Sequence, residues 1–269
     1  MRPQVTRLVV TVLAALVLST GCAGPKVSPT GIKDTVRRAY FEAMNELVGG
    51  NFVKARQLFN QVARSPRFFR YAALAKLRIG DSLFMQERFA EAIEFYRSFA
   101  AQHRSDPNLP YARYRMAVSY YKRMPSEWFA SVADHEIDQT MTREAVRELS
   151  SFLKTFPVSR FAADVREKLN EARRMLVDHI LYVADFYASR DKPRAVAWRI
   201  ESALKDYSDL VETEALVWKM ADSYAEAGDR ADAARGYARY LEAFDNGPMR
   251  GEAKKRLEAI RRQIAPSKP

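Results

Sequence analysis

The sequence is poor in the residues that build disulfide bonds, metal sites and phosphate loops. It has one cysteine, three histidines and ten glycines among 269 residues. A single thiol cannot form a disulfide bond within the chain, so its stability must come from a hydrophobic core. The histidines (His103, His135 and His179) lack metal-site spacing, and no Gly-rich phosphate loop or Gly-x-Ser-x-Gly motif occurs. These absences argue against an enzyme and give no reason to expect a metal or a non-covalent cofactor.

An apolar run near the N-terminus, Leu8 to Leu18, follows two arginines. It has about half of the roughly 20 residues that a membrane-spanning helix needs, which is typical of a signal peptide. The run leads through small residues to Cys22, an arrangement that resembles the lipobox of bacterial lipoproteins, although Ser19 stands where Leu is usual. We predict a signal peptide at 1–21, a covalent lipid (palmitate) on Cys22, and an acylated, flexible tether over 22–33. The alternative is a chance cysteine at the end of a signal peptide.

Positive charge dominates the composition. The formal net charge is +11, and removing residues 1–21 takes away two arginines and no acid, which leaves +9. In the cytoplasm such a charge would point to nucleic acid. For an exported chain it favours acidic proteins or an anionic lipid surface, and we expect no nucleic-acid partner.

Internal repetition indicates the fold. Tetratricopeptide (TPR) repeats are 34-residue helix pairs in which a small residue lies where the helices cross and an aromatic residue follows. Copies in register place Ala55 before Phe59, Ala92 before Tyr96, Ala145 before Leu149 and Ala233 before Tyr237, with a weaker copy around Val196. We predict an all-α, right-handed superhelix of about five TPR pairs, at 34–65, 69–104, 110–156, 159–207 and 211–245. An amphipathic helix at 250–263 would cap the stack.

Two irregularities interrupt the repeats. Residues 124–141 form an insertion inside the third pair, and the first helix of the fourth pair is long, over 159–189. We therefore divide the chain into an N-terminal TPR half, 34–157, and a C-terminal half, 158–269. The acids around His135 in the insertion could hold calcium loosely, but a solvated acidic loop explains them better.

At these irregularities the chain resembles the BamD family, lipoproteins of the outer-membrane β-barrel assembly machinery. The resemblance rests on the segment from Ile137 to Ala163 and on the run VADFYASRDKPRAVAWRIESALKDY. It implies a non-enzymatic scaffold, lipid-anchored to the periplasmic face of the outer membrane. The implied partners are the POTRA domains of the barrel assembly protein, unfolded outer-membrane proteins and accessory lipoproteins.

The TPR geometry predicts a client groove. Positions 2, 5, 9 and 12 of each first helix face the concave side, and in the first three repeats they are mostly apolar or aromatic. The corresponding set in the fifth repeat, which includes Trp218 and Asp222, is smaller and more polar. Tyrosine and phenylalanine supply contact area at little entropic cost, and an arginine could pair with a terminal carboxylate. We expect the groove to be lined by Arg37, Tyr40, Leu47, Leu77, Phe84, Tyr114 and Tyr121. The alternative is that these side chains pack within the stack itself.

A partner-binding surface is expected elsewhere. Arg199 matches an arginine of the BamD family, which implies a contact with the barrel assembly protein, although a solvated or internally paired arginine is the alternative. Trp128 and Phe129 in the insertion either pack under their loop or anchor a partner. Two other functions stay open: assistance to secretin or pilus assembly, and coordination of the outer membrane with peptidoglycan.

Overall fold

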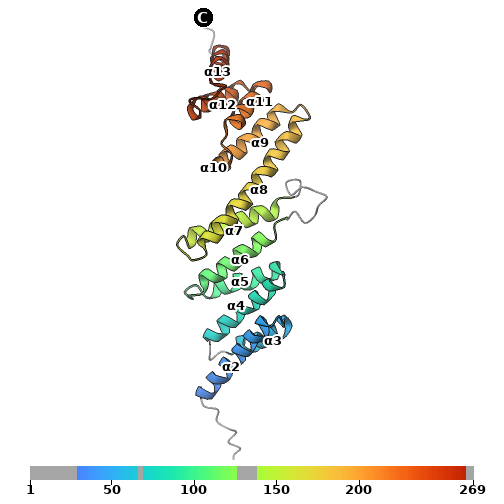
Figure 1. Ribbon diagram of the computed structural model, residues 1–269, viewed down its shortest axis with the longest axis vertical. Coiled ribbons are helices and arrows are strands. Elements are labelled where there is room, and N and C mark those ends of the chain that lie inside the picture. The colour runs from blue at the N-terminus through green and yellow to red at the C-terminus, as the bar shows by residue number, and fades with distance from the viewer. Residues whose placement is uncertain (1–28, 66–68, 126–137, 265–269) are drawn as a thin grey trace, which may run out of the picture. The chain divides into compact units, whose positions relative to one another are not determined.

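The computed structural model describes residues 29–65, 69–125 and 138–264 (Figure 1). The chain forms two compact units, one ending at Ala75 and one beginning at Lys76. All regular structure in the described ranges is helical, as the sequence predicts. The expected boundary between the N-terminal and C-terminal TPR halves, between residues 157 and 158, lies within the second unit.

The first unit contains the first helix pair. Helix α2 (Pro29–Val48) packs against α3 (Phe52–Ala63), and helix α4 (Phe69–Met85) begins in this unit and continues into the second. Tyr40 is buried against Phe59, with ring centroids 5.7 Å apart, and against Tyr71, at 5.5 Å. Ala43 and Ala55 are fully buried, which places the small residues inside the pair as the TPR pattern requires.

The second unit continues the array. Its further helices are α5 (Phe89–Gln102), α6 (Leu109–Lys122), α7 (Thr140–Thr155), α8 (Ala162–Ala188), α9 (Pro193–Asp206), α10 (Ser208–Val211), α11 (Glu214–Glu226), α12 (Arg230–Ala243) and α13 (Arg250–Ile264). Each longer helix from α5 to α13 packs on the next, with α9 followed by α11 (Figure 1). The expected long helix and C-terminal helix are thus confirmed as α8 and α13.

Small residues set the closest approaches between helices. A Cβ atom added at Gly80 would lie 2.8 Å from the ring of Tyr96, and one at Gly236 would lie 2.7 Å from the Cβ of Ala221. Both glycines are buried. These positions tolerate no larger side chain without movement of the neighbouring helix.

The turns inside four helix pairs use the same backbone conformation. Gly50, Glu87, Asp191 and Gly228 all have positive φ, between 52° and 79°. This left-handed conformation favours glycine because a Cβ atom is crowded there. The turn of the third pair lies partly outside the described residues.

Buried tyrosines join the helices through their hydroxyl groups. Four tyrosines are fully covered, and each donates a hydrogen bond to a carboxylate on another helix. The pairs are Tyr96 with Asp81, Tyr224 with Glu201, Tyr237 with Asp222 and Tyr240 with Glu214. A buried hydroxyl without a partner would be costly, so these pairs fix how successive helices meet.

Candidate functional site

Several residues expected to carry function lie outside the described residues. They are Cys22, Trp128 and Phe129, together with the signal peptide and most of the acidic insertion. Their roles stay predictions.

Three residues expected to line the client groove are part of the core. Tyr40 is 7% exposed, Leu47 5% and Leu77 0%. Side chains this covered offer no surface to a client, which supports packing within the stack at these positions. The correction has a physical cause, since burying a large apolar side chain contributes about 1.5–3 kcal/mol.

Three other predicted groove residues, Phe84, Tyr114 and Tyr121, are half-buried. The ring of Tyr114 stacks on Phe161 with centroids 4.3 Å apart, and the hydroxyl of Tyr121 donates to Glu171 at 2.6 Å. Both tyrosines are therefore engaged with the region around α8. Phe84 lies under the guanidinium of Arg115, whose Cζ is 3.6 Å from the ring centroid.

Arg37 in the first unit is exposed. Its Cζ lies 5.9 Å from the ring centroid of Phe41, which is 51% exposed. The two residues share one side of α2 with Arg38, Glu42 and Asn45 around a shallow hollow of about 610 Å³. Because the two units are described separately, Arg37 is not placed relative to Phe84, Tyr114 or Tyr121.

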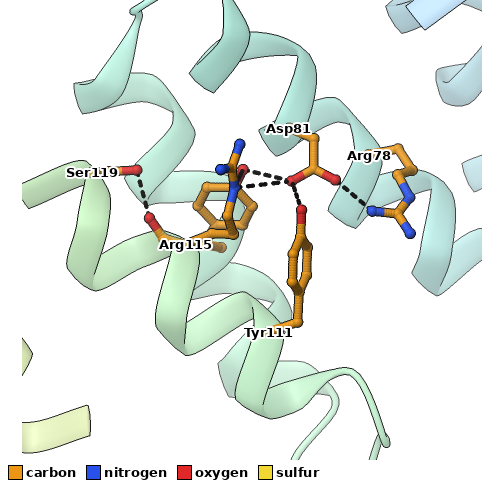
Figure 2. Close-up of polar contacts among 6 residues, drawn as sticks. Arg78, Asp81, Tyr111, Arg115 and Ser119 are labelled. Atoms are coloured by element: carbon orange, nitrogen blue, oxygen red, sulfur yellow. Dashed lines mark hydrogen bonds and ion pairs between the residues drawn. The ribbon is translucent and has the colours of Figure 1, made fainter. Parts of the chain in front are cut away.

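A polar cluster centred on Asp81 is the most developed feature of the second repeat (Figure 2). Asp81 is 5% exposed and accepts hydrogen bonds from Tyr96 at 2.7 Å and Tyr111 at 2.9 Å. Arg78 pairs with the same carboxylate at 2.6 Å, and the Nε of Arg115 lies 3.6 Å from it. Two guanidinium groups thus face one carboxylate, so the cluster carries a net charge of about +1.

The electrostatics of the cluster keep both hydroxyl groups protonated. Burial, reinforced by the charge of Asp81, raises the pKa of Tyr111 to about 12. Burial also raises the pKa of Tyr96 far above its ordinary value. Both tyrosines are therefore hydrogen-bond donors at any physiological pH, which suits their contact with the carboxylate of Asp81.

The same arrangement recurs in the fifth repeat. Asp222 accepts from Tyr237 at 3.1 Å and pairs with Arg256, whose Nη1 also donates to Tyr237 at 3.0 Å. Thirty-four residues separate Asp81 from Arg115, and thirty-four separate Asp222 from Arg256. We call each set, Asp81–Tyr96–Arg115 and Asp222–Tyr237–Arg256, an Asp–Tyr–Arg clasp. The interval of 34 residues between the aspartate and the arginine can be seen in the sequence. The repeat pattern of apolar and small residues does not contain it, because that pattern does not include charged residues.

An exposed pair lies on α9. Trp198 is 59% exposed and Arg199 beside it is also exposed. In the described part of the chain Arg199 has no hydrogen bond or ion pair, so neither Glu201 nor Asp206 pairs with it. Tryptophan and arginine are both enriched among the residues that carry most of the binding energy at protein interfaces.

The described ranges contain no group of three or more His, Cys, Asp or Glu residues arranged to hold a metal ion. Between residues 29 and 264, leaving aside the two internal gaps, no helix has the length and apolar content needed to cross a membrane.

Comparison with known families identifies the relatives of this chain. The YfiO family, described as outer membrane lipoprotein, matches residues 33–241. Among curated proteins the chain is 24% identical over 236 residues to the outer membrane protein assembly factor BamD of Caulobacter vibrioides, covering 87% of this chain and 74% of that protein. The BamD of Haemophilus influenzae is 25% identical, with 84% and 85% covered. That of Rickettsia prowazekii is 23% identical, with 84% and 86% covered.

Among solved structures, the TPR2AB-domain:pHSP90 complex of yeast Sti1 aligns over 86% of this chain and 85% of that chain. The TM-score is 0.44 and the sequence identity is 10%. A thermophilic TPR protein of Thermus thermophilus aligns with a TM-score of 0.33 and 14% identity, over 84% and 98% of the two chains.

Proposed function

This chain belongs to the YfiO family of outer membrane lipoproteins, and we propose that it is a scaffold of the machinery that assembles β-barrel proteins in the outer membrane. The match covers residues 33–241, and eight BamD relatives support the same role in outer-membrane protein assembly. In this proposal the function is binding and not catalysis. We further propose that the acylated Cys22 holds the protein at the periplasmic face of the outer membrane.

The observation that carries the docking proposal is the exposed Trp198–Arg199 pair on α9. Desolvating an unpaired arginine is favourable only when a carboxylate or a π face meets it, so this surface fits an acidic partner. We propose that it docks on the POTRA domains of the barrel assembly protein. The mature net charge of +9 favours association with an acidic surface.

The docking test is co-purification of the full, lipid-anchored chain with the barrel assembly protein. Arg199→Glu reverses one charge in the exposed pair and should weaken the complex by tenfold or more. Arg104→Glu is the matched control, because Arg104 is also exposed but lies in the turn between α5 and α6, with α6, α7 and α8 between it and α9 along the array. Equal loss from both variants, or none from either, would remove this surface from the interface.

We propose that unfolded outer-membrane proteins are the clients of the N-terminal repeats. Arg37 and the exposed Phe41 offer one contact surface, and Phe84 with Arg115 offers another. Tyr114 and Tyr121 contribute only the parts of their rings that face away from Phe161 and Glu171. Crosslinking from position 84 to a strand with an aromatic C-terminus, compared with a scrambled strand, tests this role. Equal crosslinking to both would contradict it.

Membrane attachment is tested separately. Cys22→Ala should abolish labelling by a palmitate analogue and release the protein into the soluble fraction of the cell envelope. Continued lipid labelling of the variant would place the anchor on another group.

A further inference from the structure

The last described helix, α13, is rich in positive charge. Its fifteen residues include six arginines and lysines but only two glutamates, which leaves a net charge of +4. The helix packs on α12 at the end of the array (Figure 1). The fold uses some of these charges and leaves the others at the surface.

Two of the arginines hold α13 in place. Nη1 of Arg250 donates to a backbone carbonyl of α12 at 2.7 Å. Arg256 pairs with Asp222 on α11, and its Nε donates to Glu252 at 2.9 Å. Glu252 is thereby engaged by Arg256, so Glu258 is the one acid on the rest of the helix.

The other four basic residues of α13 are exposed: Lys254, Lys255, Arg261 and Arg262. Each lysine stands seven residues, or about two helical turns, before one of the arginines, so the four side chains form two rows on one side of the helix. We call this surface, with Glu258 between the rows, the outer face of α13. In the part of the chain that the structure describes, three of the four make no ion pair, and Lys255 approaches Glu252 only to 4.0 Å.

The neighbouring helix α12 treats its charges differently. Arg235 pairs with Asp232 on the same helix, and Arg239 pairs with Glu212 at 2.8 Å. Acids of the chain therefore meet these two arginines, whereas the outer face of α13 keeps its positive charge for the surroundings.

The composition of the outer face favours a membrane surface over a protein partner. Besides the four cations and Glu258, this side of the helix exposes only Ala259 and Gln263. Ile264 is 51% exposed, but it falls in line with the buried Leu257 and not with the cations. Protein interfaces concentrate their binding energy in large side chains such as tryptophan and tyrosine, and this face has none. Long basic side chains without fixed partners suit a surface whose negative charges are many and mobile, as lipid head groups are.

We propose that the outer face of α13 binds the anionic head groups of a lipid bilayer. Each lysine or arginine near such a surface strengthens binding about fivefold. The inference rests on the proposed location at the outer membrane and adds a second contact to it. The lipid on Cys22 attaches the N-terminal end of the mature chain, and α13 brings the C-terminal end to the same surface.

The test is flotation of the mature chain with lipid vesicles, using Cys22→Ala so that no acyl chain contributes. The vesicles are either phosphatidylcholine alone or phosphatidylcholine and phosphatidylglycerol in equal parts. The protein should bind the anionic vesicles only, and binding should weaken as the salt concentration rises. The double variant Lys255→Gln with Arg262→Gln removes one row and should weaken binding at least tenfold.

The matched control is the double variant Lys122→Gln with Lys154→Gln. It removes the same charge from exposed lysines of α6 and α7, which α8 to α12 separate from α13 along the array, and it should leave binding unchanged. Glutamine keeps a high helix propensity, and circular dichroism verifies that both variants stay folded.

Three outcomes would overturn the assignment. Equal binding of both kinds of vesicle would exclude recognition of anionic lipid, and equal loss in the two double variants would show that overall charge acts and not α13. Unchanged vesicle binding in the α13 variant, with loss of co-purifying barrel assembly protein, would assign this face to an acidic protein. The vesicle assay uses an unacylated chain and no partner, so its failure is distinguishable from failure of the anchor on Cys22 or of docking through Arg199.

Discussion

Gly236→Ala tests whether the helices are held as closely as the structure describes. Gly236 is buried where α12 crosses α11, and an added Cβ would lie 2.7 Å from the Cβ and 2.9 Å from the Cα of Ala221. The neighbouring atoms belong to the backbone or are bonded directly to it, so no side-chain rotation relieves the contact. Overpacking of this kind costs about 1–3 kcal/mol, and replacing a helical glycine with alanine returns about 0.5–1 kcal/mol.

The expected net loss in the free energy of unfolding is about 1–2 kcal/mol. For a chain of this length, each kcal/mol lost lowers Tm by about 2–4 °C. Thermal unfolding of the mature chain, followed by far-ultraviolet circular dichroism, measures it. Gly251→Ala is the control, since an added Cβ at Gly251 has no neighbour within 4 Å and should cause no loss. Ala221→Gly combined with Gly236→Ala removes the shorter contact and should restore part of the stability. An unchanged or raised Tm in Gly236→Ala alone would refute the close crossing.

Three further predictions concern turns, clasps and pH. Glu87→Gly should stabilise the protein by about 0.5–1 kcal/mol because Glu87 has φ of 59°, whereas Gly228→Ala, at φ of 76°, should destabilise it by a similar amount; urea titration measures both. Tyr237→Phe removes a donor to Asp222 and should lower stability by about 1 kcal/mol; an unchanged urea midpoint would show that Arg256 alone satisfies the carboxylate. Burial raises the pKa of Tyr111 and Tyr237 to about 12 from an ordinary 10.0, so their contribution to stability is complete below pH 10 and lost as pH rises to 12. The urea midpoint should fall across that range, and a midpoint that rises there would contradict the assignment.

The helix pairs were predictable because their signals are local. A small residue four positions before a large apolar one marks the second helix of four of the five pairs, and the observed helices match the expected ranges closely. The short helix α10 was missed, because a single turn of four residues is too short to show a helical period of apolar residues. The turns were harder to recognise from the sequence than the helices. At two of them the residue with positive φ is not glycine but Glu87 or Asp191, so no glycine marks the turn.

The candidate site was less predictable because position within a repeat does not determine burial. The TPR position rule assigned Tyr40, Leu47 and Leu77 to an open groove, but their rings and methyl groups are covered within the core. Arg115 was not selected at all. Its place in the clasp depends on contacts with Asp81, Tyr96 and Phe84, and a sequence pattern gives the spacing of these residues but not their contacts.

The central claim, a role in assembling outer-membrane β-barrels, is tested most directly by depleting this protein in its own cells and following newly made barrel proteins. Folded barrels migrate differently from unfolded ones on gels without heating, so the folded fraction can be measured over time. The account predicts that unfolded barrel proteins accumulate soon after depletion, and that the intact chain, supplied in trans, restores folding. Barrel folding at the normal rate in depleted cells, with a defect only in secretin assembly or in the cell wall, would contradict it.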